Sequence, residues 1–358
     1  MRLTKKNITH YLLDKGFLEP SSFMSGDYLL TQTQSRNSIF KIQQQAHGLF
    51  VKQLVAQDST NSYLMQKDAT SHYLIHQSDL YKETANHIPD YYGYDPYHNI
   101  LVTEYFANTK NVHEVTYRDK KLSKEHAVKM GHILASFHFD ITEKIKDNSS
   151  LQFFSKQIPW VLNTGQLLNA NPNGITNTVI SEIHKHQDLV QKIEKVAAQW
   201  ETTSLIHGDI KWMNFIVMPN NEDVKLVDWE IADLGDPLWD VAGVFQSYFS
   251  AWVLSFNNQN IQQHQQIQGN EFLSVESITP VVKLLWNTYA EKQEFTPAES
   301  KKKLLKSLSY MSIRMIQTAF ENNVAQKQLH PNSVRILQFC NHILGNAEGI
   351  AKQWNLID

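Results

Sequence analysis

The sequence Leu205-Ile-His-Gly-Asp-Ile-Lys-Trp-Met-Asn-Phe-Ile-Val217, followed by Val224-Lys-Leu-Val-Asp-Trp-Glu230, places polar residues between short apolar runs. The apolar runs are typical of strands, and the polar residues between them predict a hairpin that holds a site. Asp209 carries a carboxylate that can accept a proton from a hydroxyl group. Asn214 and Asp228 carry oxygen atoms suited to a hard cation such as Mg²⁺. The stretch therefore indicates the chemistry of phosphoryl transfer.

Length, charge and cysteine content limit the class of protein. A chain of 358 residues, 19% charged and 42% hydrophobic, is long enough for one large or two medium globular domains. Its formal charge of −3 provides no basic surface for nucleic acid or an anionic membrane. The one cysteine, Cys340, lies in an apolar run and is expected to be a packed helix residue. Because no apolar run approaches about 18 residues, we expect a cytoplasmic protein with no membrane contact.

The two elements His207-Gly-Asp-x-x-x-x-Asn214 and Asp228-Trp-Glu230 resemble the motifs of the aminoglycoside phosphotransferase and choline kinase-like family. This family is a branch of the protein-kinase-like fold. The resemblance implies an α+β, bilobal architecture with a small N-lobe, built on an antiparallel sheet, and a larger, mainly helical C-lobe. We place the N-lobe, with the ATP-binding sheet and helix, at residues 1–106. The C-lobe, with the catalytic loops and acceptor-binding helices, is placed at residues 107–358.

Three strand-like runs near the N-terminus, 28–33, 38–42 and 48–54, predict the antiparallel sheet. In the resembled fold the first hairpin covers the phosphates of ATP. Residues 31–38 contain no glycine, although glycine best allows backbone amides to approach a phosphate. The side chains expected to substitute as donors are those of Ser35, Asn37 and Ser38.

Lys52 interrupts the apolar third run, and an unpaired ammonium is costly to bury. The resemblance assigns the α- and β-phosphates of ATP to this lysine, with a carboxylate partner from the next helix. We expect Asp68 to be that partner, where the family usually has glutamate, with Glu83 as the alternative. Because aspartate is one methylene shorter, the pair is expected to be looser or bridged by water.

Residues 99–106 predict a further strand, which in the resembled fold leads to the hinge between the lobes. Adenine bonds to backbone groups there, so the resemblance places Thr103 at the back of the pocket. Glu104 and Phe106 then present backbone groups to the base. The alternative is an edge strand without a ligand.

The resemblance also assigns roles on the two central loops. Asp209 is the expected catalytic base, and Lys211 either neutralises the γ-phosphate or faces solvent. Asn214 and Asp228 are expected to hold Mg²⁺. Glu230 is expected to share the metal, the alternative being a solvent-facing acid.

Other polar residues are expected to be structural. His207 orders the catalytic loop by hydrogen bonding, and Gly235-Asp-Pro-x-x-Asp240 matches a family element in which Asp240 braces that loop from behind. His138, in the predicted helix 125–141, is expected to be a hydrogen-bonding residue of the interior.

The C-terminal third is mainly helical in pattern, with amphipathic runs at 277–292, 297–326 and 331–354. Residues 257–270 are almost wholly Asn and Gln without a charged residue, which predicts a flexible loop. Four tryptophans are candidates for an aromatic cage around a choline-type acceptor, although core positions are the favoured interpretation. They are Trp160, Trp239, Trp252 and Trp286.

The sequence therefore predicts an ATP- and Mg²⁺-dependent phosphotransferase acting on a hydroxyl of a small molecule, such as an amino alcohol, a sugar or an aminoglycoside-like compound. Two alternatives stay open: a kinase for a peptide Ser or Thr, and a nucleotide-binding pseudokinase scaffold. The glycine-free hairpin and Asp68 favour the scaffold, whereas the intact Asp209, Asn214 and Asp228 oppose it.

Overall fold

The computed structural model describes the chain apart from residues 25–27, 35, 44–47, 56–57, 145–148, 170–176, 220–222, 257–270, 325 and 327. Ser35 and the predicted flexible loop 257–270 lie outside the described residues. The chain forms two compact units. The first comprises Met1–Val112 and Asn214–Ala232, and the second comprises His113–Met213 and Asp233–Asp358.

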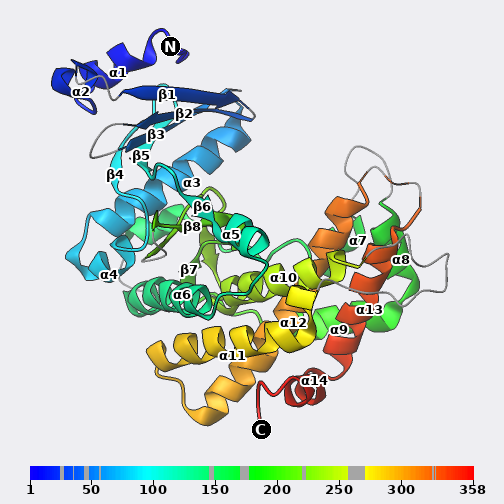
Figure 1. Cartoon of the computed structure of the whole chain (residues 1–358). Helices are drawn as coiled ribbons and strands as arrows, with labels where there is room; N and C mark the ends of the chain where they lie inside the picture. Colours follow the sequence, from blue (N-terminus) through cyan, green and yellow to red (C-terminus); the bar gives the residue numbers. More distant parts are fainter. Residues whose placement is uncertain are drawn as a thin grey trace. The chain divides into compact units, whose positions relative to one another are not determined.

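The first unit is built around a five-stranded antiparallel sheet, as the alternating sequence predicts (Figure 1). Its strands are β1 (Leu29–Gln34), β2 (Asn37–Gln43), β3 (Gly48–Leu54), β4 (Tyr91–Asp95) and β5 (Ile100–Tyr105). The spatial order is β1-β2-β3-β5-β4, so β3 is the central strand. Lys52 of β3 pairs in register with Ile39 on one side and Leu101 on the other. The sheet therefore holds this lysine at its centre.

Helices cover both faces of this sheet. Successive residues of a strand point to opposite faces, so Val51 packs with α1 (Ile8–Asp14) and Lys52 turns toward the face of α3 (Ser59–His76). The Asp58 side chain caps α3 by accepting a hydrogen bond from the Asn61 amide, 2.8 Å long. Shorter helices complete the region: α2 (Pro20–Met24), η1 (Asp79–Tyr81) and α4 (Lys82–Ala85).

The chain returns to the first unit after a long excursion. Strand β8 (Phe215–Val217) pairs with β6 (Lys110–Asn111) and with β9 (Val224–Leu226) in a small antiparallel sheet. The Leu226 amide also donates to the carbonyl of His87, at 2.8 Å. These long-range pairs explain why the first unit extends to Val112 and includes residues 214–232, whereas the sequence placed a single boundary at residue 106.

The second unit is mainly helical, in agreement with the predicted fold class (Figure 1). Its larger helices are α6 (Lys124–Lys144), α9 (Gln187–Ala197), α10 (Leu238–Leu254), α11 (Val275–Lys292), α12 (Pro297–Asn322) and α13 (Pro331–Gly345). Its shorter elements are α5 (Val112–Asp119), η2 (Ser149–Phe153), α7 (Thr164–Asn169), α8 (Thr178–Lys185), β7 (Ser204–Ile206), η4 (Trp212–Asn214), β10 (Asp233–Gly235), η7 (Glu271–Leu273) and α14 (Ala347–Gln353). Strands β7 and β10 pair antiparallel.

Close helix packing positions the elements of this unit. Helix α6 packs on α11, and a Cβ at Gly131 would lie only 2.6 Å from the carbonyl oxygen of Leu285. Glycine is therefore required at this crossing. Helix α12 packs on α10 and α13, and a reciprocal capping box between Thr296 and Glu299 begins it.

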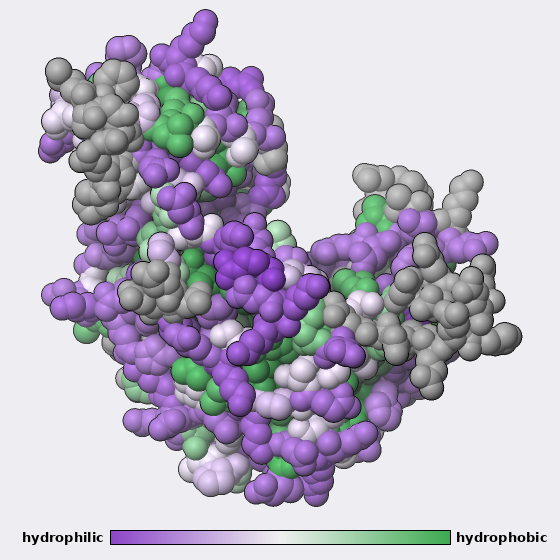
Figure 2. Space-filling model, in the orientation of Figure 1, coloured by the Kyte–Doolittle hydropathy of each residue, from purple (hydrophilic) through white to green (hydrophobic). Residues whose placement is uncertain are grey.

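Two of the four tryptophans considered for an aromatic cage are core residues. Trp239 and Trp286 are buried, whereas Trp160 and Trp252 are half-buried and each contacts a phenylalanine ring. Cys340 is fully buried with its Sγ 2.6 Å from the Ser312 carbonyl, which confirms a packed thiol. The face of the molecule drawn in Figure 2 consists mainly of hydrophilic residues. None of the described helices has both the length and the apolar composition needed to cross a membrane.

Candidate active site

Three predicted site residues converge on the ammonium group of a fourth, Lys52, in the first unit. Lys52 Nζ lies 2.9 Å from Asp68 Oδ2, 3.1 Å from Asp228 Oδ1 and 2.9 Å from Glu230 Oε2. These partners come from α3 and from the segment after β9, far apart in the sequence. The side chains of Lys52 and Asp68 are only 7% and 5% exposed, whereas Asp228 is 39% exposed. One oxygen-rich edge of the cluster therefore stays accessible.

The three carboxylates keep Lys52 charged despite its burial. Burial alone lowers the pKa of the ammonium, because a charge loses its hydration. The attraction of Asp68, Asp228 and Glu230 outweighs this effect, so the pKa of Lys52 is raised above its usual value. A permanent positive charge at this position suits a residue that binds phosphate.

Asp68 is the carboxylate partner of Lys52 from α3, as expected, and Glu83 on α4 is not among the described partners of this lysine. The expectation of a loose or water-bridged pair is wrong, because the contact is direct. The second oxygen of Asp68 accepts a hydrogen bond from the Trp229 amide, 3.3 Å long. Asp68 thus positions both Lys52 and the backbone that follows Asp228.

The backbone at Asp228 is in the left-handed region, with φ of 73°. This conformation is unfavourable for a non-glycine residue and is concentrated at functional sites. The preceding amide, of Val227, donates to the carbonyl of Asn214 at 3.0 Å. The structure thereby brings together Asn214 and Asp228, the two residues predicted to hold a metal.

The donor chemistry of these residues fits Mg²⁺. Asn214, Asp228 and Glu230 offer amide and carboxylate oxygens, and Mg²⁺ is usually held by one or two carboxylates together with substrate phosphates. Within the described part of the chain, no three His, Cys, Asp or Glu side chains are grouped as a metal site. Lys52 lies between the two carboxylates instead. The set therefore fits a cation that is bound jointly with a nucleotide.

The other predicted nucleotide-binding residues lie on the same sheet. Asn37 and Ser38 begin β2 and are buried. The Asn37 Oδ1 has no hydrogen-bond partner among the described residues, while the Ser38 hydroxyl accepts from Gln32 at 3.1 Å. Thr103 is buried on β5.

Two backbone groups predicted to face adenine have partners within the chain. The Glu104 amide donates to the Asp90 carbonyl at 2.9 Å, and the Phe106 carbonyl accepts from the Thr109 hydroxyl at 2.9 Å. Their assignment to the base stays a prediction.

Arg36, in the turn before β2, was not among the residues predicted for the site. Its guanidinium forms an ion pair with Glu230 Oε1, on the carboxylate whose Oε2 contacts Lys52. A basic side chain in a glycine-free turn was the available signal.

The second unit holds the catalytic loop on one buried carboxylate. Asp240 is fully buried at the start of α10 and accepts hydrogen bonds from the amides of His207, at 2.6 Å, and Gly208, at 2.9 Å. Gly208 has φ of 82°, which only glycine adopts freely, and this lets two successive amides face one carboxylate. Asp240 lies behind the loop, where the prediction placed it.

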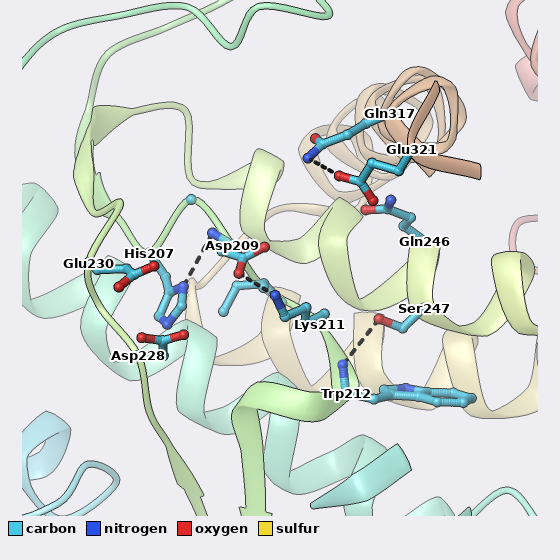
Figure 3. A network of polar contacts seen from close by, with 12 residues as sticks. His207, Asp209, Lys211, Trp212, Asp228, Glu230, Gln246, Ser247, Gln317 and Glu321 are labelled. Atoms are coloured by element: carbon cyan, nitrogen blue, oxygen red, sulfur yellow. Dashed lines mark hydrogen bonds and ion pairs between the residues drawn. The ribbon is translucent and has the colours of Figure 1, made fainter. Parts of the chain in front are cut away.

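His207 and His138 complete this support. The Asp209 amide donates to His207 Nδ1 at 3.3 Å, so the imidazole orders the loop as predicted (Figure 3). His138 lies 3.3 Å from Asp240 and 3.1 Å from the Tyr289 hydroxyl. Burial lowers the pKa of His138 and keeps it neutral. Burial raises the pKa of Asp240, but hydrogen bonds from His138 and the His207 amide outweigh it, so the carboxylate is ionised.

Asp209 itself is accessible. Its side chain is 32% exposed and pairs with Lys211, whose Nζ lies 2.5 Å from Asp209 Oδ2 (Figure 3). Lys211 is 45% exposed. A carboxylate on a rigid loop with one side open to solvent can accept a proton from a bound hydroxyl.

A second brace, not predicted from the sequence, comes from α12. Arg314 is buried and donates to the carbonyls of Ile210, at 3.2 Å, and Gly208, at 3.4 Å. A Cβ at Gly243 of α10 would lie 2.5 Å from the Ile210 carbonyl, so glycine allows the loop to approach that helix. The available signal was a single arginine within the apolar run 310–316.

Comparison with known proteins identifies a family for this chain. The sequence model of the phosphotransferase enzyme family matches residues 88–273, more than half of the chain. Acyl-CoA dehydrogenase family member 10 of Mus musculus is 36% identical over 70 residues. That match covers 19% of this chain and 6% of the relative, so the chain spans a small part of the relative's length.

Solved structures show the same fold at low sequence identity. Choline kinase LicA from Streptococcus pneumoniae is 15% identical, with 93% of this chain and 99% of that chain covered and a TM-score of 0.51. The ternary complex of APH(2")-IIa with streptomycin and ATP is 14% identical, with 96% and 99% covered and a TM-score of 0.51. Glucosamine kinase in complex with glucosamine, ADP and inorganic phosphate is 10% identical, with 97% and 84% covered and a TM-score of 0.54. The chain belongs to the phosphotransferase enzyme family and has the bilobal α+β fold of protein-kinase-like enzymes.

Proposed function

We propose that this phosphotransferase moves the γ-phosphoryl group of ATP to a hydroxyl group of a small molecule, with Mg²⁺ as cofactor. The observation that carries the proposal is the convergence of Asp68, Asp228 and Glu230 on the ammonium of Lys52. These residues were assigned to phosphate and metal binding from separate stretches of sequence. Their meeting in one cluster is what a nucleotide-dependent enzyme requires.

On the nucleotide side, Lys52 binds phosphate oxygens through its permanently charged ammonium, and Asp68 holds it in place. Asn214, Asp228 and Glu230 would hold Mg²⁺, which supplies charge neutralisation of the phosphates when bound. Asp228 follows the end of β9 and has a left-handed backbone conformation. This pre-set conformation reduces the reorganisation needed to bind the cation.

On the acceptor side, Asp209 orients the hydroxyl group and accepts its proton. Asp240 and Arg314 immobilise the loop that carries Asp209, because they bind its amides and its carbonyls respectively. Lys211 balances the charge of Asp209 in the free protein. During transfer it would pair with the phosphoryl group instead. Positioning and charge placement are the main means by which proteins accelerate phosphoryl transfer.

The acceptor is proposed to be an alcohol that carries an amino group. Gln246 of α10 and Gln317 and Glu321 of α12 form a polar group drawn with Asp209 in Figure 3. Glu321 accepts a hydrogen bond from Gln317 at 3.0 Å. Burial lowers the pKa of Arg314, and the nearby carboxylates of Asp240, Asp209 and Glu321 act against this shift. Carboxylates and amide oxygens in this region favour a cationic acceptor. Choline kinase, glucosamine kinase and the streptomycin complex, which share the fold, carry names of amine-bearing compounds.

ATP consumption measured over a panel of amino alcohols, amino sugars, aminoglycosides, neutral sugars and Ser- or Thr-containing peptides tests the proposal. Wild-type protein is expected to consume ATP with at least one amine-bearing alcohol, and Asp209→Asn with none. ATP consumption only with the peptides would show that the acceptor is a peptide Ser or Thr and not an amine-bearing alcohol. Binding of Mg²⁺ and ATP without turnover on any acceptor would favour a nucleotide-binding scaffold, for which the glycine-free turn before β2 is the supporting observation.

A further inference from the structure

Arg36 occupies an unusual position in the first unit. It lies in the turn between β1 and β2, and its guanidinium reaches Glu230, which is 194 positions further along the chain. Glu230 binds two cations at once, since its Oε1 pairs with Arg36 and its Oε2 lies 2.9 Å from Lys52 Nζ. Arg36 is therefore separated from the phosphate-binding lysine by a single carboxylate.

The charge balance of this cluster has a consequence for Arg36. Two cations, Lys52 and Arg36, share three carboxylates, of which Asp228 and Glu230 are the proposed metal ligands. A carboxylate that coordinates a divalent cation has less negative charge available for a guanidinium. Cation binding by Glu230 therefore weakens its hold on Arg36, while the phosphates that accompany the cation offer new acceptors.

Breaking the ion pair between Arg36 and Glu230 costs little free energy. The Arg36 side chain is 48% exposed, and an ion pair at this exposure changes an equilibrium by about fivefold at most. A guanidinium that binds two phosphate oxygens side by side gains more, on the order of ten- to a hundredfold. Arginine also has a planar fork of donors that suits phosphate better than the point charge of lysine.

The turn itself lacks the usual means of binding phosphate. Residues 31–38 contain no glycine, so close approach of several backbone amides to a phosphate is restricted. The Ser38 hydroxyl already accepts a hydrogen bond from Gln32 across the hairpin. Arg36 provides the one formal positive charge of residues 31–38.

We infer that Arg36 is a phosphate-binding residue of the nucleotide site: it is held on Glu230 without nucleotide and transfers to the terminal phosphates of ATP when Mg²⁺ and ATP bind. The inference rests on the proposed function, because it takes ATP as the ligand. A side-chain charge at the tip of the hairpin thereby replaces the backbone amides of a glycine-rich turn.

Equilibrium binding of ATP, ADP and AMP, measured by titration calorimetry with Mg²⁺ and without any acceptor, tests this role apart from catalysis. Arg36→Ala is expected to weaken ATP binding about tenfold or more and to leave AMP binding within about twofold. Arg36→Lys keeps the charge without the fork and is expected to recover only part of the loss. Lys15→Ala is the matched control, since Lys15 is 50% exposed and pairs with Asp95 in the same unit at 3.5 Å. Its ATP affinity is expected to equal that of wild type.

Equal ATP affinity in Arg36→Ala and wild type would overturn the inference, and so would tighter binding in the variant, which would make Arg36 only a competitor of the cation for Glu230. An equal loss for ATP and AMP would also overturn it, because the contact would then not involve the terminal phosphates. Thermal unfolding of each variant checks that the sheet is intact. If wild-type protein itself binds no ATP, the proposed function fails along with the inference, and this outcome is distinct from a failure of Arg36 alone.

Discussion

The replacement Asp240→Asn tests how the catalytic loop is held. The carboxylate of Asp240 is fully buried and accepts three hydrogen bonds: from the amides of His207 and Gly208 and from the ring of His138. Asparagine has nearly the same shape but only one accepting atom. If its oxygen stays on the His207 amide, its NH₂ group faces the Gly208 amide, and two donors meet.

The magnitude follows from this count. A hydrogen bond to a charged acceptor is worth about 1.5–3 kcal/mol, and a buried donor left unsatisfied costs about 1–3 kcal/mol. We therefore expect Asp240→Asn to lower the free energy of unfolding by about 3 kcal/mol or more. Asp209 directly follows Gly208, so a shift of the loop caused by the lost hydrogen bond would also displace the proposed catalytic base. A displacement of about 1 Å lowers turnover roughly a hundredfold.

Urea unfolding followed by circular dichroism measures the first effect, and transferase turnover measures the second. Asp188→Asn, on the exposed surface of α9, is the matched control and is expected to unfold at the wild-type urea concentration. An Asp240→Asn protein that unfolds within about 0.5 kcal/mol of wild type and retains its turnover would refute the assignment of Asp240 as the brace.

Three further predictions follow from the site and its support. Asp209→Asn is expected to abolish phosphoryl transfer, while the ATP affinity and the unfolding midpoint stay at wild-type values. Normal turnover in this variant would contradict the proposal that Asp209 is the catalytic base. Gly243→Ala is expected to lose about 1–3 kcal/mol of stability, since a Cβ would meet the Ile210 carbonyl at 2.5 Å. Gly165→Ala serves as control, because its Cβ would meet only the Asn163 side-chain oxygen, at 3.4 Å; equal stability of the two variants would contradict the tight approach at Gly243. Burial lowers the pKa of His72 to about 4, so below pH 6.5 the unfolded chain binds a proton that the folded protein does not. Stability is expected to fall as pH decreases from about 6.5 to 4, by up to about 1.4 kcal/mol per pH unit for this group, and His72→Gln should flatten the dependence measured by urea unfolding; an unchanged slope would contradict a buried, neutral imidazole.

Local patterns predicted the parts of the site that depend on neighbouring residues. The alternation around Lys52 places it on the α3 face of the sheet. Because an unpaired ammonium is costly to bury, the sequence also predicted a carboxylate nearby, and Asp68 is that carboxylate. The spacing between Asp209 and Asn214 put both on one loop. Such site residues can be predicted from sequence because each is a charged or polar residue next to apolar strand residues.

Contacts across long sequence separations could not be predicted from the pattern. Arg314 lies about a hundred positions from the loop it supports, and the return of 214–232 to the first unit depends on pairing with β6. The predicted helix 331–354 is in fact two helices, because the Asn346 side chain accepts from the Gly349 amide and begins α14. Periodicity alone did not reveal this break, since both halves are amphipathic.

Transfer of a labelled phosphoryl group tests the central claim most directly. The protein is incubated with Mg²⁺, an amine-bearing alcohol and ATP labelled with ¹⁸O in its γ-phosphoryl group, and the product is identified by mass spectrometry. Wild-type protein is predicted to place the labelled group on the alcohol, and Asp228→Ala to yield no labelled product. Bound Mg²⁺ and ATP with no phosphorylated product from wild-type protein, over the full panel of acceptors, would contradict the account.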